Sequence, residues 1–252
     1  MMKPALPLMT LVACLLGASQ AWADPRLDEV VYSPYVQNHV AELEIRHGQQ
    51  LDGATAGEAT TVFEAEYGLN DRVSLALAGS LASASGRASQ FDRVGIEGIV
   101  YLGQVPRIGV DTGLYLEYTH GLNGEPDVAE AKLLVAKTAG RFQGLANLIV
   151  ERPLNAPAGE NFSSYGYAVS ATWQAVAGLR LGAEAFGDLG DDHGFLTRPV
   201  GAYVGPQLKW EGRPAGSPFE IDLDIGWLAA VGANRNEASS QVKFAVELER
   251  RF

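Results

Sequence analysis

Carboxylates recur at every second position in four short stretches of the chain. The four pairs are Glu42 and Glu44, Glu64 and Glu66, Glu220 and Asp222, and Glu247 and Glu249. Successive side chains of a β-strand point to opposite faces, so each pair would project from one face of its strand. A wall of such groups attracts cations and would suit a cationic solute or a metal ion. The alternative is a set of solvated or salt-bridged charges that fill an interior and pass nothing.

Few basic residues accompany this acidic wall. Those expected to face the same interior are Arg46, Arg72, Lys243 and Arg251. Four bases cannot pair with eight carboxylates, so we expect a net acidic interior. The sequence has no zinc-protease, phosphate-loop or dinucleotide motif. We therefore expect no cofactor, no resident metal and no catalytic residues.

Histidine could indicate a lipid-hydrolysing barrel, the second functional class. Only His120 is suggestive, because it lies on the apolar face near the end of its stretch. A nucleophile and its base must lie within hydrogen-bond reach, and no serine shares that face there. An interfacial side chain is the simpler interpretation of His120, and the sequence favours a protein that is not an enzyme.

The body of the chain consists of alternating segments separated by Gly, Asn, Asp and Pro, and no segment has a helical period. Twelve strands are predicted at about 38–47, 58–68, 72–82, 91–102, 108–120, 128–138, 142–151, 165–174, 179–187, 200–210, 219–229 and 241–252. Pro206 lies inside the tenth and suggests a bulge, because it cannot donate to the ladder. Long connections alternate with mostly short ones, as in barrels with long outer loops and short periplasmic turns.

In most of these strands one face is almost uncharged and the other carries the charge. Aromatic residues lie at both ends of the apolar faces: Tyr67, Phe142, Trp173, Trp210, Phe219 and Phe252 near the turns, and Tyr118, Tyr165 and Trp227 near the loops. A bilayer selects such girdles, since amphipathic rings suit its interface. The pattern predicts an all-β fold, a closed antiparallel up-and-down transmembrane β-barrel of about 12 strands.

The chain ends on an alternating strand whose last residue is aromatic. Its apolar face carries Phe244, Val246, Leu248 and Phe252. Outer-membrane barrels typically end in this way, and the assembly machinery recognises the signal. Arg250 departs from the pattern and is expected to extend toward the interface. Barrel closure would bring the last two predicted strands beside the first two, with all eight carboxylates on one lumen wall.

The first residues have the features of a secretory signal. Lys3 precedes an apolar run over 4–18, and Ala21 and Ala23 provide the small residues of a cleavage site before Asp24. A lipoprotein signal at Cys14 is the alternative. Residues 1–23 are thus expected to be a signal peptide and 24–252 the barrel. Loss of Lys3 changes the net charge from −11 to −12, which argues against nucleic acid as a partner.

The stretch 63–75, FEAEYGLNDRVSL, contains a strand, a turn and a strand. Gly68 is expected to adopt unusual dihedral angles, with Asn70 and Asp71 forming the turn. The stretch resembles a pattern found in Gram-negative outer-membrane barrels, the transporter family named after the MetA pathway of phenol degradation. The resemblance covers thirteen residues and implies an outer-membrane transporter.

Together these features predict a Gram-negative outer-membrane barrel that passes small neutral or cationic solutes passively through a charged lumen. The expected partners are outer-membrane lipid, the barrel assembly machinery and a small solute that the sequence does not identify. A filled structural or interaction barrel without transport is the main alternative, and an outer-membrane lipid hydrolase is a further one. Neutralising Glu42, Glu44, Glu64 and Glu66 should shift ion selectivity away from cations if the lumen conducts.

Overall fold

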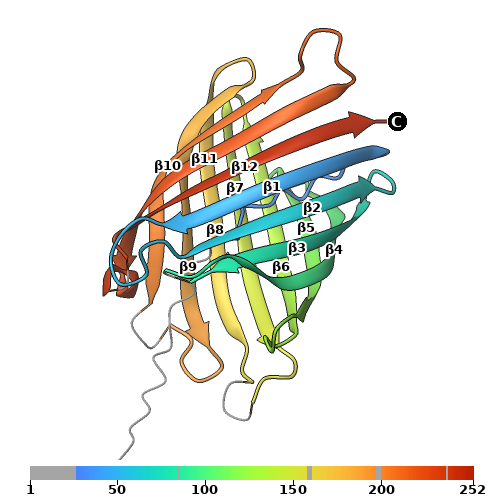
Figure 1. Ribbon diagram of the computed structural model, residues 1–252. Coiled ribbons are helices and arrows are strands. Elements are labelled where there is room, and N and C mark those ends of the chain that lie inside the picture. The colour runs from blue at the N-terminus through green and yellow to red at the C-terminus, as the bar shows by residue number, and fades with distance from the viewer. Residues whose placement is uncertain (1–26, 85, 158–160, 197–199, 237) are drawn as a thin grey trace, which may run out of the picture.

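The computed structural model describes residues 27–84, 86–157, 161–196, 200–236 and 238–252. The predicted signal peptide and its cleavage site lie outside the described residues. Twelve strands make up the fold (Figure 1): β1(Val40–Gln50), β2(Ala59–Gly68), β3(Val73–Ser83), β4(Gln90–Val105), β5(Val110–Gly121), β6(Val128–Ala139), β7(Phe142–Pro153), β8(Ser164–Val176), β9(Leu179–Asp191), β10(Gly201–Gly212), β11(Phe219–Gly232) and β12(Ser240–Arg251). Each coincides with a predicted strand to within a few residues.

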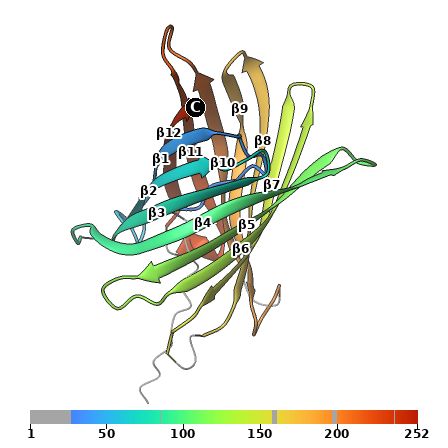
Figure 2. The ribbon, with the colours of Figure 1, turned by 90° about the vertical axis from the view of Figure 1, so that its right-hand side faces the viewer.

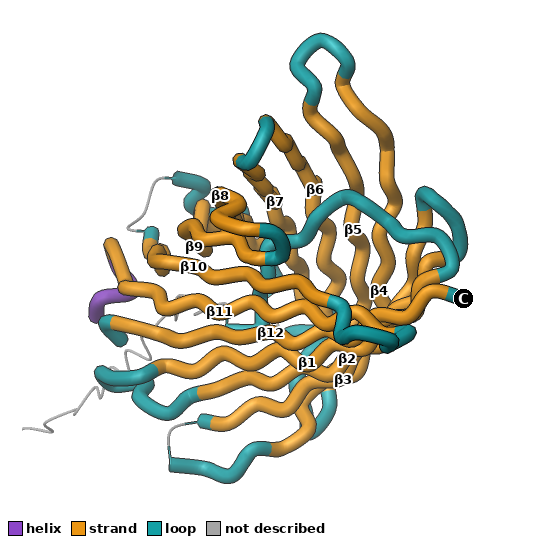
Figure 3. Tube along the Cα trace, turned by 90° about the horizontal axis from the view of Figure 1, so that it is seen from above, coloured by secondary structure: helices purple, strands orange, loops and turns teal. Residues whose placement is uncertain are grey.

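The strands form one closed antiparallel barrel in which every strand pairs with its neighbours in the chain. Closure is made by β1 and β12, which pair from Val40 with Arg251 to Gln50 with Gln241. Figures 2 and 3 show the tilted strands from the side and from above. The predicted fold class is confirmed.

Connections at the two ends of the barrel differ in length. Short turns at 69–72, 106–109, 140–141, 177–178 and 213–218 lie at the end where β1 begins. Longer loops lie at the other end, and one contains the 3-10 helix η1(Ala233–Asn236). Among the described residues, no helix is long and apolar enough to cross a membrane.

Large apolar side chains cover the outside of the barrel. Leu43, Leu77, Ile96, Leu116 and Leu148 are between 50% and 66% exposed. In water such a continuous apolar surface would be unstable, but in a bilayer it contacts lipid. Most members of the predicted aromatic girdles are also exposed, with Phe142 at 64% and Phe252 at 69%.

An apolar cluster occupies part of the interior, which the alternation did not predict. Inward side chains of β6 to β11 form a buried cluster together with Val31, which precedes the first strand. It contains Val31, Ala136, Leu145, Ile149, Ala168, Phe186, Tyr203, Leu228 and Ala230. These strands therefore carry apolar residues on both faces over part of their length, and the cluster fills the lumen there.

Pro206 does not produce the expected bulge. Val204 pairs with Ala229 and Gln207 with Gly226, so the register of β10 and β11 is the same on both sides of the proline. The ladder is interrupted at Gly205 and Pro206 without an inserted residue. On the other side, Pro206 lies opposite Ala183 of β9.

Candidate functional site

The eight predicted wall carboxylates lie in two rows that cross four adjacent strands. The pairing of β2, β1, β12 and β11 sets Glu66, Glu42, Glu249 and Glu220 in one row and Glu64, Glu44, Glu247 and Asp222 in the next. Barrel closure is what brings them together, because β1 and β12 are the two ends of the strand series. The structure thus places all eight on one wall.

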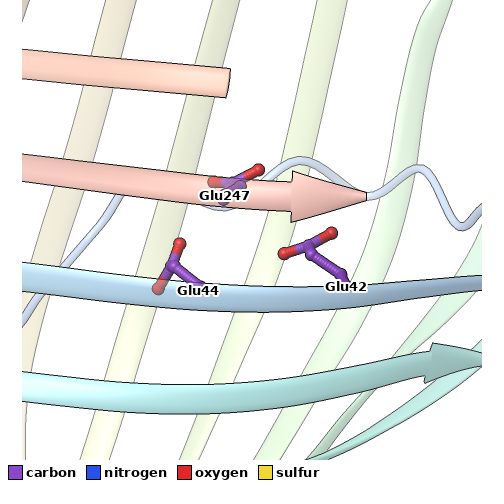
Figure 4. Close-up of side chains that lie close together, drawn as sticks. All are labelled: Glu42, Glu44 and Glu247. Carbon is purple, nitrogen blue, oxygen red and sulfur yellow. The ribbon is translucent and has the colours of Figure 1, made fainter. Parts of the chain in front are cut away.

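Within these rows carboxylate oxygens approach one another closely. Oxygens of Glu42, Glu44 and Glu247 lie within 4.8 Å of one another, and so do those of Asp222, Glu247 and Glu249. Figure 4 shows Glu42 and Glu44 projecting from β1 toward Glu247 on β12. Like charges at this separation repel strongly in a half-buried site. The arrangement therefore favours a cation or a proton near the wall.

Of the predicted lumen bases, Arg46 and Lys243 are buried beside the wall. Arg46 Nη1 lies 2.6 Å from Glu44 Oε1 and 2.5 Å from Glu64 Oε2, with each side chain less than a tenth exposed. Lys243 donates to the backbone carbonyl of Glu29. A single guanidinium thus pairs with two carboxylates of the inner row, the row formed by Glu64, Glu44, Glu247 and Asp222, and it balances only one of their two charges.

Arg72 was predicted to face the interior, and the structure places it at the turn-side end of the barrel, just before β3. It is exposed in the turn between β2 and β3, where its backbone N–H donates to Asn70 Oδ1 at 2.8 Å. Arg72 comes directly before β3, which begins at Val73, and so precedes the residues of that strand whose side chains point inward. Arg251 is also exposed, at the turn-side mouth, and its Nη2 donates to Gln37 Oε1 at 3.1 Å.

A feature that the sequence analysis missed is a chain segment inside the barrel. Residues 27–37, here called the lumen segment, precede β1 and run through the interior, as the blue trace behind β1 in Figure 1 shows. Tyr32 is bound through its backbone, because its N–H donates to Asn147 Oδ1 at 2.7 Å and its carbonyl accepts from Asn147 Nδ2 at 2.9 Å. Asn147 is fully buried on β7.

Side chains of the lumen segment contact several walls. Glu29 Oε1 lies 2.6 Å from Lys132 Nζ on β6. The Tyr32 ring packs on Tyr115 of β5 with centroids 4.7 Å apart. Near the turns, the Tyr35 hydroxyl donates to Asp111 Oδ2 at 2.8 Å. The segment is therefore anchored along its length.

Inward glycines provide the space for this segment. A Cβ on Gly48 would clash with the carbonyl of Leu27, and one on Gly113 would lie 2.8 Å from Pro34 Cβ. Gly68 was predicted to adopt unusual dihedral angles, but it is not among the positive-φ glycines. Instead, its missing side chain admits the carbonyl of Gln37.

Cavities lie toward both ends of the described interior. A cavity of about 550 Å³ reaches from the loop-side ends of β2 to β7 down to Tyr32 and Arg46. A second of about 180 Å³ lies at the turn side, between Arg180, Lys209 and Asp222. The lumen segment contributes Leu27, Asp28, Glu29 and Tyr32 to the lining of the first cavity and no residue to that of the second.

The residues of the predicted assembly signal face outward. Phe244 and Val246 are exposed on β12, and Phe252 follows the strand with its N–H donating to the carbonyl of His39 at 2.9 Å. Leu248 is partly exposed on the same face. Arg250 lies over Phe252, with its guanidinium carbon 4.9 Å from the ring centroid.

His120 forms part of a polar cluster at the outer rim. Its Nδ1 lies 2.7 Å from Asp127 Oδ1, and Asp127 also accepts from the Tyr118 hydroxyl and the Gly121 N–H. The Tyr118 hydroxyl and the Gly121 N–H lower the pKa of Asp127. A histidine oriented by an aspartate resembles part of a catalytic triad. No serine is hydrogen-bonded to His120 among the described residues.

The long loop after β1 is joined to the loop before β12 by one carboxylate. Asp52 Oδ1 accepts from Ser239 N at 2.6 Å, and Oδ2 accepts from the Ser239 hydroxyl at 2.5 Å. These hydrogen bonds lower the pKa of Asp52. The contact continues the closing seam of β1 and β12 beyond the strands.

Comparison with solved structures supports an outer-membrane fold. The KdgM porin aligns with a TM-score of 0.52 and 8% identity over 84% of this chain and 99% of that chain. The structure titled KdgM porin in complex with disordered oligogalacturonate aligns with a TM-score of 0.50 and 9% identity over the same shares. No family model matches the chain. No curated protein matches it either.

The resemblance to the MetA-pathway transporters therefore stays a prediction. What the neighbours and the apolar exterior establish is coarser. The chain has the porin-like fold of a bacterial outer-membrane β-barrel, in agreement with the predicted location in the cell outer membrane.

Proposed function

We propose that this barrel is a channel for small solutes that prefers cations over anions. The observation that carries the proposal is the pair of carboxylate rows on β2, β1, β12 and β11. Rings or walls of acidic side chains give a pore cation preference, because they lower the energy of a cation and raise that of an anion. Among the ion pairs of the described residues, those of Arg46 are the only ones that include carboxylates of the inner row.

Porin-like neighbours make passage the first function to test. One neighbour was solved with oligogalacturonate, an acidic saccharide. The acidic wall here favours solutes of the opposite charge. The selectivity is thus inferred from this chain's own residues and not from the neighbour.

A filled barrel is the second candidate, and the lumen segment favours it. The segment and the apolar cluster occupy the interior at mid-height. Conduction would require the segment to move or solutes to pass beside it. The His120 and Asp127 pair gives the lipid hydrolase less support, because its nucleophile is missing among the described contacts.

The test is conductance of refolded protein comprising residues 24–252 in planar bilayers under a salt gradient. The variant E42Q/E66Q/E249Q neutralises three carboxylates and leaves the Arg46 pairs intact. We expect cation-selective steps in the wild type and a reversal potential closer to zero in the variant. The control D71N/E125Q removes two exposed charges outside the rows.

Two results would overturn the proposal. One is a reversal potential that the triple variant leaves unchanged. The other is the absence of conductance both in the wild type and in N147L, a variant that weakens the binding of the lumen segment inside the barrel. The second result would support the filled barrel.

A further inference from the structure

The outer surface of the barrel carries basic but no acidic side chains near the turns. In the turn-side halves of the described strands, the charged residues at outward positions are Lys137 on β6 and Arg250 on β12. Lys137 is exposed and alternates with Leu134 and Ala136, which are buried in the interior. Arg141 adds a third base in the two-residue turn between β6 and β7. The exterior at this level therefore attracts anions.

Two of these bases lie beside two outward aromatic rings. Lys137 lies opposite Gly144 in the pairing of β6 with β7. Phe142 lies opposite Trp173 in the pairing of β7 with β8. The guanidinium carbon of Arg141 lies 5.9 Å from the centroid of the Trp173 ring. These four side chains, Lys137, Arg141, Phe142 and Trp173, are here called the β6–β8 patch.

The β6–β8 patch is held in place and open to a ligand. The backbone carbonyl of Arg141 accepts from the Gln174 N–H at 2.9 Å and from Arg180 Nη2 at 3.2 Å, which fixes the turn. The ion pairs of the described residues include neither Lys137 nor Arg141. A Cβ on Gly144 would meet no atom within 4 Å, so the surface beside Lys137 is open.

The same combination of a base and aromatic rings recurs where the barrel closes. The guanidinium carbon of Arg250 lies 5.6 Å from the Phe219 ring centroid and 4.9 Å from that of Phe252. Arg250 also has no ion pair among the described residues. A guanidinium that is held by a ring instead of a carboxylate keeps its charge unpaired, and its forked donors suit a phosphate.

We propose that the β6–β8 patch binds the headgroup of an anionic phospholipid in the turn-side leaflet of the bilayer. Aromatic girdles lie at the membrane interface, which is the level of the lipid phosphates. Lys137 and Arg141 bind the phosphate, and the open surface at Gly144 admits the start of an acyl chain. A zwitterionic lipid carries an ammonium that offsets its phosphate, so two bases favour the anionic lipid. This inference concerns the outer surface and stands whether or not the lumen conducts.

Trp173 reports on this site, because a brominated lipid quenches the fluorescence of a tryptophan that it touches. Protein comprising residues 24–252 with W210F/W227F keeps Trp173 as its single tryptophan. In mixed bilayers, competition between brominated phosphatidylglycerol and phosphatidylcholine gives their relative affinities at this ring. We expect phosphatidylglycerol to be preferred roughly 5- to 25-fold, since each base near a membrane surface contributes roughly 5-fold. K137Q/R141Q should bring the ratio to about 1.

Two further variants serve as controls. R87Q/R152Q removes two exposed bases at the loop side and should change the preference less than about 2-fold. K137R/R141K keeps both positive charges and should keep most of the preference.

Several outcomes refute the inference. Equal affinity of the two lipids for the parent protein refutes it, and so does a preference that K137Q/R141Q leaves unchanged. An equal loss of preference in R87Q/R152Q would indicate a general effect of surface charge. Loss of the preference when phosphate replaces chloride at equal ionic strength would identify a site for the free anion instead of the lipid.

Discussion

Asn147 is expected to control whether the lumen segment stays in the barrel. Its amide forms a two-point contact with the backbone of Tyr32, at 2.7 and 2.9 Å. The side chain thus acts as a short piece of neighbouring strand. Asn147→Leu keeps the branched shape and the number of side-chain heavy atoms and removes both hydrogen bonds.

The magnitude follows from the two hydrogen bonds. Each contributes about 0.5–1.5 kcal/mol net, so the segment would lose roughly 1–3 kcal/mol of binding free energy. This corresponds to roughly a 5- to 150-fold shift toward the displaced segment. The contacts of Glu29 with Lys132 and of Tyr35 with Asp111 remain as other anchors of the segment, and the strand pairs that close the barrel are unchanged, so the barrel itself should stay folded.

Thiol accessibility measures this shift. The single cysteine of the chain is Cys14, so refolded protein comprising residues 24–252 has none. Ser33→Cys places a reporter in the lumen segment, and a charged methanethiosulfonate reagent modifies it when the segment leaves the interior. We expect the rate to rise about 5- to 150-fold in the Asn147→Leu background.

Gln143→Leu is the matched control, because it lies on the same face of β7 and lines the turn-side cavity. Its rate should equal that of the parent. Equal rates in the Asn147→Leu and parent backgrounds would show that Asn147 does not hold the segment. Modification that is already fast in the parent would show that the segment is not bound in solution.

Three further predictions concern charge and space. Arg46→Met should lower the free energy of unfolding by roughly 3–5 kcal/mol, since it leaves Glu44 and Glu64 buried without their base. Urea unfolding, followed by the heat-dependent shift of the barrel on a gel, measures this loss. Failure of E44Q/E64Q to restore stability in the Arg46→Met background would contradict the explanation. The hydrogen bonds from Ser239 lower the pKa of Asp52 in the folded protein below its usual 3.8, so the loop contact stabilises the fold above the unfolded-state pKa and is lost as the pH falls through the folded-state pKa. The Ser239 amide should therefore be better protected from hydrogen exchange in the wild type than in Asp52→Asn at neutral pH, and the difference should vanish in acid. Equal protection of the two proteins at neutral pH would refute this role of Asp52. Gly68→Val should raise Ser33→Cys reactivity, because its side chain needs the space of the Gln37 carbonyl, whereas Gly144→Val, with open space around it, should not.

The strands could be predicted because a half-buried strand repeats every two residues. The carboxylate rows could be predicted for the same reason, once closure placed the last strands beside the first. The alternation of side chains was less informative about which residues fill the lumen. Leu134, Phe186, Tyr203 and Leu228 are fully or almost fully buried inside strands whose outer faces are also apolar. A two-residue period cannot separate lipid-facing from interior apolar residues when both faces are apolar.

The lumen segment could not be predicted because it has no period of its own. Its contacts join residues far apart in the chain, such as Tyr32 with Asn147. Gly48, Gly68 and Gly113 did mark its path, since each is an inward glycine in a strand. A glycine in a strand interior often indicates close approach of another backbone. Inward glycines therefore identify the path of a segment only when the segment that approaches them is already known.

The lumen segment also defines what transport would require. A cation entering from the loops would meet the cavity carboxylates first and the wall rows last. Arg46 forms ion pairs with Glu44 and Glu64, and Lys132 forms ion pairs with Glu29 and Glu130. A mobile cation must compete with these fixed cations for the same carboxylates, so passage requires exchange of carboxylate partners, displacement of the segment or a path beside it. Displacement would remove Glu29 and leave Lys132 with Glu130. A conducting state and a segment-bound state are therefore coupled through the same ion pairs, and substitutions at Asn147 and at the wall should act on conductance together.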